Sequence, residues 1–288
     1  MVSVVIPTKN RSSDVEETLD TLLNQSLKLG EVIFADDSTN LATKDLIEKY
    51  RSAYSSKNIE LKHAWDSGST ARARTLGGLM SKGEIIVYMD DDLVLRNDSM
   101  EILVKTLQET QAMAVWGHIY FPDSSRSQLI KALGAPYYRF LFGGVEHGGG
   151  FFAIRRKVLE DKVWFDHNLV GYALGEEKDF ACNLCKHYGS ASIVQVENPR
   201  LAVNKGTLTK NKKYYAYLFG TTIYYSRKWG GPLRLILAVP LTLLLCSFHM
   251  ISEGGRGKSS ISKKEILGAC LNVVKNLRLV LNGKFDLL

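Results

Sequence analysis

The stretch Ile85-Ile86-Val87-Tyr88-Met89-Asp90-Asp91-Asp92 places three consecutive carboxylates directly after an apolar run. The apolar run is entered through Lys82-Gly83-Glu84 and predicts a buried strand. The acids then lie at the carboxyl end of that strand, which is where open α/β sheets form their ligand crevices.

The three carboxylates repel one another and raise each other's pKa unless a cation neutralises them. Side chains on an extended segment alternate between faces, so Asp90 and Asp92 are predicted to share one cation while Asp91 points away. Hard oxygen ligands at a strand end suit Mg²⁺ or Mn²⁺ held jointly with substrate phosphates. A solvated acidic turn is the alternative interpretation.

Three further strands are predicted before the triplet, and polar residues follow each of them. Val2–Arg11 reads as a strand ending in a polar loop, after which Ser13 or Asp14 is predicted to cap a helix with apolar residues at helical spacing. The second strand, Val32–Ala35, ends in Asp36-Asp37-Ser38, and the third, around Ile59–Leu61, leads to Gly68–Gly77. Polar residues delivered repeatedly to one sheet edge are typical of a nucleotide site.

These segments, taken in order, resemble the GT-A glycosyltransferases of family 2, which are inverting enzymes that use nucleotide-diphospho-sugars. The resemblance extends over roughly the first 200 residues. The matching pieces are Val4-Val5-Ile6-Pro7-Thr8 with Asn10, Asp36-Asp37-Ser38, Ala73-Arg74 with Gly77, Asp90-Asp91-Asp92, Gly148-Gly149-Gly150 before Ala153-Ile154-Arg155-Arg156, Phe165-Asp166, and Gly175-Glu176-Glu177-Lys178-Asp179-Phe180.

The resemblance implies an α/β fold with a GT-A (Rossmann-like) mixed sheet flanked by helices. The catalytic domain is expected over residues 1–210, with a nucleotide-sugar half over about 1–95 and an acceptor half over about 96–210. Residues 211–288 are expected to form a basic, aromatic and Leu-rich helical region that associates with a membrane.

Roles for individual residues follow from the same resemblance. A divalent metal, Mg²⁺ or Mn²⁺, is expected on Asp90 and Asp92, bridging the diphosphate, with Arg74 adding positive charge. Arg72 is a second candidate for added charge, with a surface helix residue as the alternative. Asp37 is expected to be a solvated neighbour. The residues expected to bind the nucleotide-sugar are Pro7, Thr8, Asn10, Arg11, Asp36, Ser38, Arg74, Asp90 and Asp91.

The catalytic base is expected in the acidic segment that follows Gly175, where the family usually has Glu-Asp. By that match Glu177 is the base, and Glu176 and Asp179 are its neighbouring candidates. Acids that merely complement a helix dipole are the alternative. Gly148–Gly150 would let the backbone approach the sugar, with Glu146 or His147 touching donor or acceptor hydroxyls.

Two further positions depart from the family pattern. Thr75 stands where the family often has Asn, and Asn204 stands where some relatives have a His that binds the metal. Lys205 is an alternative phosphate partner in that segment. Together with Glu177 these departures leave open a catalytically weak or inactive scaffold at the membrane.

Other classes of protein fit the sequence less well. A Rossmann dehydrogenase needs a G-x-G-x-x-G turn after the first strand, which Pro7–Arg11 does not provide, and a nucleotidyltransferase would open with a glycine-rich loop. Cys182 and Cys185 form a lone C-x-x-C pair inside a predicted helix from Lys178 to Tyr188, which favours packed thiols over zinc or redox chemistry. Four cysteines without a secretory signal indicate a reducing compartment.

The net charge of +7 is unevenly distributed along the chain. Up to residue 198 there are 22 basic and 27 acidic residues, whereas from 199 onward there are 15 basic and 3 acidic. The basic part contains Leu233 and the uncharged run Leu235–Phe248, whose 14 residues fall short of the ~20 of a spanning helix and are divided by Pro240.

Aromatic and basic residues precede this run, and an amphipathic stretch over Ile266–Leu281 follows it. The pattern favours contact with the cytoplasmic face of a membrane over full spanning, with a packed soluble helix as the alternative. The Leu-rich run argues against nucleic-acid binding. The aromatic residues expected at the interface are Tyr214, Tyr215, Tyr217, Tyr224, Tyr225 and Trp229.

The sequence therefore predicts a hexosyltransferase-type enzyme that moves a sugar from a nucleotide-diphospho-sugar to a hydroxyl or phosphate of an acceptor. A UDP-sugar is the favoured donor, with GDP- and dTDP-sugars as alternatives. A lipid-linked acceptor is favoured because a soluble one would not require the apolar, basic C-terminal region. The product would serve a cell-surface polysaccharide or glycoprotein.

Overall fold

The computed structural model describes residues 1–65, 68–121, 149–171, 174–196, 199–206, 211–254 and 261–284. The chain forms two compact units. The first comprises residues 1–125, 147–165 and 180–206, and the second comprises residues 126–146, 166–179 and 207–288. The segment 166–179 groups with the C-terminal helices, which the sequence did not predict, and the predicted boundary at residue 210 falls outside the described residues.

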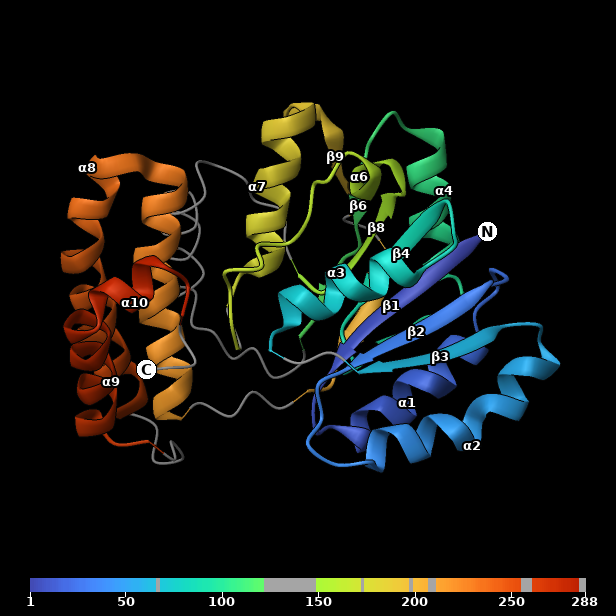
Figure 1. The fold of residues 1–288 in the computed structure, drawn as a ribbon, viewed down its shortest axis with the longest axis horizontal. Coiled ribbons are helices and arrows are strands. Elements are labelled where there is room, and N and C mark those ends of the chain that lie inside the picture. Colours follow the sequence, from blue (N-terminus) through green and yellow to red (C-terminus); the bar gives the residue numbers. More distant parts are fainter. Residues whose placement is uncertain are drawn as a thin grey trace. The chain divides into compact units, whose positions relative to one another are not determined.

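A seven-stranded sheet forms the centre of the first unit (Figure 1), with the strand order β3-β2-β1-β4-β8-β6-β9. Strand β1 pairs in parallel with β2 and β4, whereas β8 runs antiparallel to both β4 and β6, so the sheet is mixed as predicted. The strands are β1 (Val2–Thr8), β2 (Glu31–Asp36), β3 (Glu60–Trp65), β4 (Ile85–Met89), β6 (Ala114–Trp116), β8 (Phe151–Arg155) and β9 (Ile193–Gln195).

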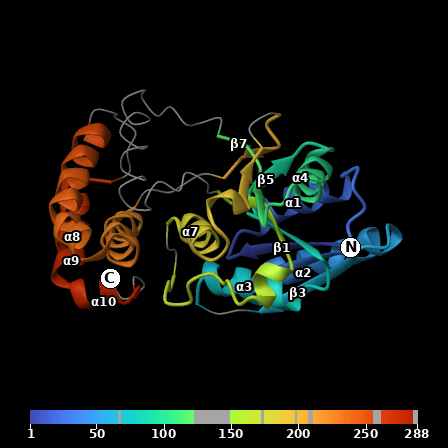
Figure 2. The same cartoon turned by 90° about the horizontal axis from the view of Figure 1, so that it is seen from above.

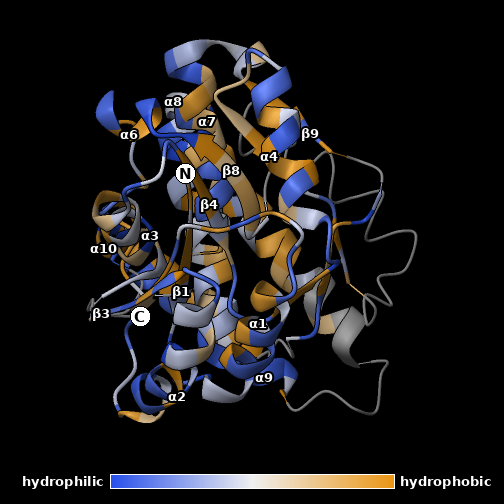
Figure 3. Ribbon diagram, turned by 90° about the vertical axis from the view of Figure 1, so that its right-hand side faces the viewer, coloured by the Kyte–Doolittle hydropathy of each residue, from blue (hydrophilic) through white to orange (hydrophobic). Residues whose placement is uncertain are grey.

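Helices cover both faces of this sheet because its central strands β4 and β8 are apolar along almost their whole length, and Figure 3 colours both mostly as hydrophobic. Figure 2 shows α3 on the other side of β1 from α1 and α4. The helices of this part are α1 (Ser12–Leu23), α2 (Ala42–Ser56), α3 (Thr70–Met80), α4 (Ser99–Glu109), the short α6 (Lys157–Glu160), α7 (Glu176–Tyr188), which begins in the second unit, and the 3₁₀ turn Ser190–Ser192.

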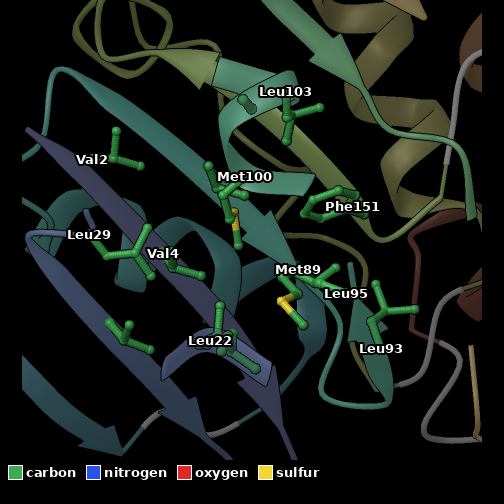
Figure 4. Packing of buried hydrophobic residues seen from close by; sticks show 14 of the residues in the cluster. Val2, Val4, Leu22, Leu29, Met89, Leu93, Leu95, Met100, Leu103 and Phe151 are labelled. Atoms are coloured by element: carbon green, nitrogen blue, oxygen red, sulfur yellow. The ribbon is translucent and has the colours of Figure 1, made fainter. Parts of the chain in front are cut away.

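The main apolar core lies on the face of the sheet that α1 and α4 cover (Figure 4). Val4 and Met89 of the strands are fully buried there against Leu22 of α1 and Leu103 of α4. The opposite face is closed by α3, which approaches β1 closely because Gly77 has no side chain: a Cβ there would lie 2.4 Å from Val5 Cγ1.

A second, three-stranded sheet has the order β5-β10-β7, with β5 at Leu93–Leu95, β10 at Ala202–Asn204 and β7 at Ile119–Tyr120. Strand β10 runs antiparallel to β5, with Asn204 opposite Leu93. This pairing brings the chain after residue 200 back beside the aspartate triplet, over a hundred residues away in sequence.

In the second unit, the helices α8, α9 and α10 pack side by side (Figure 1). Helix α8 (Lys212–Gly254) is interrupted at Gly231, whose φ of 67° is non-helical, and Pro232 follows at once. Helix α9 (Lys263–Lys275) starts with a capping box formed by Ser262 and Glu265, and α10 spans Leu277–Leu281.

Three local sequence predictions need correction. Helix α1 begins after Arg11 without a side-chain cap, because the Asp14 carboxylate accepts from Arg11 Nε at 2.8 Å instead. The amphipathic stretch Ile266–Leu281 is two helices, broken at Asn276. The third strand runs to Trp65, so it includes a histidine that the shorter predicted strand left out.

The aromatic residues expected at a membrane interface are mostly interior. Tyr215, Tyr217, Tyr224 and Tyr225 are buried, and that part of the prediction is wrong. The exposed apolar residues lie instead after the break in α8 and on α9, and they are Leu233, Ile236, Leu237, Leu243, Leu244, Leu267 and Leu271.

The close contact at Gly77 gives a stability prediction. Gly77→Ala should destabilise the fold by about 1–3 kcal/mol, because the clash with Val5 outweighs the ~1 kcal/mol that Ala adds to a helix. The matched control is Gly268→Ala in α9, where a Cβ would meet nothing within 4 Å and stability should rise slightly. Urea unfolding followed by circular dichroism measures both, and a Gly77→Ala protein as stable as the wild type would contradict the packing.

Candidate active site

Asp90, the first acid of the triplet, is held by the backbone directly before β8 and by an arginine of α3. Its N–H donates to the Gly150 carbonyl at 2.8 Å, and its Oδ1 accepts from Arg74 Nη2 at 2.5 Å. Arg74 is buried, with its guanidinium 5.7 Å from the centre of the Phe165 ring. Arg74 therefore contacts the triplet and orients Asp90, whereas Arg72 is exposed on the same helix.

Asp91 points into the protein and joins three elements. Its carboxylate accepts from Thr8 Oγ1 at 2.6 Å and from Arg11 Nη1 at 2.7 Å, while its carbonyl accepts from Thr18 Oγ1 at 2.8 Å. Burial raises the pKa of Asp91 to about 7, although Arg11 and Thr8 act in the opposite direction. Asp91 thus fastens the end of β1 and the start of α1 to the triplet.

Asp92 is held from the other side. Its Oδ2 accepts from Arg11 Nη2 and its Oδ1 from Asn204 Nδ2, both at 2.8 Å, and its carbonyl accepts from Lys205 N–H at 3.0 Å. Strand β10 of the small sheet places Asn204 beside Asp92. The residue that the sequence offered as a metal ligand therefore donates a hydrogen bond to Asp92 through its side-chain amide. The ammonium group of Lys205 pairs with Glu17.

The oxygens of Asp90 and Asp92 fit a divalent cation shared with a substrate. Their side chains are 32% and 13% exposed, against 5% for Asp91. Glycine backbone lies against each, since a Cβ at Gly150 or Gly206 would come within 1.8 Å of the respective Oδ2. Within the described ranges no three His, Cys, Asp or Glu side chains gather as a metal site. Mg²⁺ needs only one or two carboxylates when phosphates and water complete its shell.

The loops after β1 and β2 are bound to each other beside the triplet. Asn10 has a positive φ of 55°, its N–H donates to Ser38 Oγ at 2.7 Å, and its Oδ1 accepts from Thr39 N–H at 2.9 Å. These contacts bring together the nucleotide-binding candidates of the two loops, Pro7, Thr8, Asn10, Arg11, Asp36 and Ser38, at one edge of the sheet.

The two acids that end β2 have different environments from those predicted. Asp36 is fully buried, and it accepts from Ser38 N–H at 2.8 Å and pairs with His63 Nε2 at 2.9 Å. Asp37 was expected to be solvated, but its carboxylate holds Lys9 Nζ at 2.5 Å and the Gly68 N–H at 3.0 Å. The sequence did not indicate His63, because the predicted third strand ended before this residue.

The acidic segment of α7 separates into accessible and buried acids. Gly175 turns the chain with a φ of 88°, and Glu177 in the first helical turn is half-buried. Glu176 is buried, and Asp179 is fully buried, with both oxygens bound by α8: Lys228 Nζ and Trp229 Nε1 donate at 2.7 Å each. Asp179 is therefore occupied by a structural ion pair, which leaves Glu177 as the more accessible candidate base.

Several remaining sequence predictions can be placed briefly. Glu146, His147 and Gly148 lie outside the described residues. Cys182 is buried and Cys185 half-buried, and both are free thiols, in agreement with packed cysteines. Thr75 is buried and donates to the Ala71 carbonyl within α3 at 3.1 Å.

Comparison with known proteins identifies the family of this fold and site. The family model described as glycosyl transferase family 2 matches residues 3–164, which is more than half of the chain. The chain therefore belongs to glycosyl transferase family 2. The matched range of this family 2 chain contains the triplet and the loops after β1 and β2, and it ends before α7.

Individual relatives agree with the family match. The chain is 26% identical over 125 residues to the glycosyltransferase GlyG of Streptococcus pneumoniae, covering 43% of this chain and 41% of GlyG. It is 22% identical over 174 residues to the GalNAc(5)-diNAcBac-PP-undecaprenol beta-1,3-glucosyltransferase of Campylobacter jejuni, covering 59% and 56%. In both relatives the match thus spans less than two thirds of their length.

The fold is also similar to that of a solved archaeal enzyme. The mannosyltransferase PcManGT from Pyrobaculum calidifontis, in complex with GDP-Man and Mn²⁺, aligns with a TM-score of 0.62 at 17% identity. The alignment covers 99% of this chain and 84% of PcManGT. At that identity the similarity shows the GT-A fold.

The burial of Asp91 predicts a pH dependence of stability. Its folded pKa lies above the ordinary value, so the folded state binds the proton more tightly and loses stability as pH rises through about 7. Relative to Asp91→Asn, the wild type should lose up to about 3 kcal/mol between about pH 5 and about pH 8. Urea unfolding at several pH values measures this, with the exposed Asp98→Asn as control. If the free energy of unfolding depends on pH in the same way for the wild type and Asp91→Asn, the raised pKa of Asp91 is contradicted.

Proposed function

We propose that this family 2 chain is an inverting glycosyltransferase that moves a sugar from a nucleotide-diphospho-sugar to a hydroxyl or phosphate of a lipid-linked acceptor. The observation that carries the proposal is the pair of accessible carboxylates, Asp90 and Asp92, at the edge of the sheet where the β1 and β2 loops meet. Family membership supports the same reaction class. UDP-sugars are the first donors to test, and GDP- and dTDP-sugars follow.

In this proposal the donor diphosphate binds at the triplet. Asp90 and Asp92 would hold Mg²⁺ or Mn²⁺, which when bound supplies positive charge that stabilises the leaving diphosphate. Arg74 and Arg11 fix the carboxylates through the bonds described above, so the acids are already oriented before the donor arrives. Arg72, exposed on α3, would add charge for a phosphate.

The nucleoside would lie over the β1 and β2 loops. Thr8, Asn10 and Ser38 offer polar groups there, and Asp36 supports the loop through Ser38 and His63. Because Asp36 is fully buried, we infer that Asp36 shapes the pocket and that Asn10 and Ser38 make the closer contacts with the ribose.

Glu177 is proposed as the general base. An acceptor hydroxyl attacks the anomeric carbon from the side opposite the leaving group, the bond to the diphosphate breaks, and the hydroxyl proton passes to the Glu177 carboxylate. Inversion at the anomeric carbon follows from this single displacement. The first turn of a helix favours the ionised carboxylate that the base needs.

The lipid-linked acceptor is inferred from the C-terminal region. Helix α8 contains one stretch, Lys212–Ser247, long and apolar enough by length and composition to cross a membrane, and 17% of its most apolar window is buried. The Campylobacter relative is named for a polyprenyl-linked substrate. Exposed leucines together with the excess of basic residues fit contact with an anionic membrane surface on the cytoplasmic side.

The base assignment predicts the behaviour of Glu177→Gln. This variant keeps size and polarity but cannot accept a proton, so kcat should fall by about 10²–10⁴ while donor binding is retained. Turnover is measured with the most rapidly hydrolysed donor from a panel of UDP-, GDP- and dTDP-sugars with Mn²⁺. Near-normal kcat in Glu177→Gln would remove Glu177 from this role, and no hydrolysis of any donor by the wild type would favour the scaffold alternative.

The membrane assignment is tested by liposome flotation of the full chain. Ile236 and Leu244 are 71% and 67% exposed, and replacing both with Asp should abolish flotation with anionic liposomes at low salt. The control is Leu79→Asp, an equally apolar exposed position on α3, which should float as the wild type does. If the double variant floats normally, or the wild type does not float, these helices are not the membrane contact.

A further inference from the structure

Helix α8 carries a lysine that is shared by two acids of the same unit. Lys228 Nζ lies 2.6 Å from Asp166 Oδ2 and 2.7 Å from Asp179 Oδ2. Asp179 is fully buried and Asp166 nearly so. Asp179 belongs to the first turn of α7, two residues after Glu177.

Two further donors from α8 complete this cluster. Trp229 Nε1 donates to Asp179 Oδ1 at 2.7 Å, and the Tyr224 hydroxyl donates to Asp166 Oδ2 at 2.5 Å. One cation faces two carboxylates, so these neutral donors are needed to stabilise the remaining negative charge. Burial works to raise the pKa of Asp166, yet Lys228 and Tyr224 hold it below its ordinary value.

The cluster joins the first turn of α7 to the last turn before the break in α8. Helix α7 starts after Gly175, which has a φ of 88°, and α8 is interrupted at Gly231, two residues after Trp229. The first turn of a helix lacks intrahelical partners for its N–H groups and frays unless other contacts hold it. Here the last turn before the break in α8 holds the first turn of α7 through Asp179.

We propose that Lys228 and Trp229 are positioning residues for the reaction, because they fix the first turn of α7 and with it the Glu177 carboxylate. The inference rests on the proposed role of Glu177 as the base. Proton transfer requires the base within hydrogen-bond reach of the acceptor, and a displacement of about 1 Å costs up to about 10²-fold in rate. Lys228 and Trp229 touch neither donor nor acceptor and act through Asp179.

Three variants test the proposal in the full chain. Lys228→Met leaves Asp179 buried without its cation, and kcat for the donor chosen above should fall about 10²-fold with the donor KM unchanged. Lys228→Arg restores the charge and should recover part of the loss. Trp229→Phe keeps an aromatic ring but removes the N–H donor to Asp179, and it should lower kcat by about tenfold. If Lys228→Met does not fold, Trp229→Phe provides the test of the cluster.

The control is Arg227→Gln, one residue before Lys228. Arg227 is exposed and donates to the Leu281 carbonyl at 2.8 Å, so its loss removes a neighbouring charge from α8 without changing the cluster. It should keep the wild-type kcat. Hydrogen exchange of the amides of residues 177–180 should be faster in Lys228→Met and unchanged in Arg227→Gln.

The outcomes separate this inference from the proposed function. Folded Lys228→Met or Trp229→Phe with wild-type kcat, alongside an inactive Glu177→Gln, would overturn the positioning role alone. A fall in kcat that Lys228→Arg does not relieve, with a matching rise in KM, would indicate general damage and would also overturn it. An active Glu177→Gln would overturn the base assignment and the inference together.

Discussion

The pairing of two arginines with the aspartate triplet is the constraint on which the site depends. Three adjacent carboxylates at the end of β4 would repel one another, and Arg11, directly before α1, and Arg74 of α3 bring two positive charges to them. Because α1 and α3 lie on opposite faces of the sheet, the same bonds also fix the start of α1 and the position of α3. Removing either arginine would take away one of the positive charges that offset this repulsion.

That arrangement divides the three acids by burial. Asp91 has a structural role, because Thr8 and Arg11 bind its carboxylate inside the protein. Asp90 and Asp92 remain partly exposed at the sheet edge. Gly150 and Gly206 leave the backbone close to those two acids. The alternation of side chains along a strand end thus separates a structural carboxylate from the pair proposed to bind the metal.

Local sequence patterns predicted much of the fold and of the candidate site. The remaining features depend on contacts between residues that are far apart in the sequence. The apolar run Ile85–Met89 is β4 as predicted, and the mixed sheet and Arg74 beside the triplet followed from the family resemblance. His63 could not be found by spacing, because it reaches Asp36 only through the pairing of β3 with β2. The family resemblance singled out Asn204, but its contact with Asp92 depends on the pairing of β10 with β5. Tyr224 and Tyr225 were assigned to a membrane interface because a basic, aromatic stretch has the same composition whether it faces lipid or packs inside. Burial of a charge such as Lys228 depends on a partner 49 residues away, Asp179, which no local pattern encodes.

The account is tested most directly by calorimetric titration of UDP and GDP into the full chain, with Mn²⁺ and after EDTA treatment. If Asp90 and Asp92 share a metal with the diphosphate, at least one nucleotide should bind with Mn²⁺ and lose most of its affinity in EDTA. Asp92→Asn should lose the metal-dependent part, while Asp98→Asn, on an exposed pair with Arg96, should not. Nucleotide binding that is the same with Mn²⁺, in EDTA and in Asp92→Asn would contradict the account.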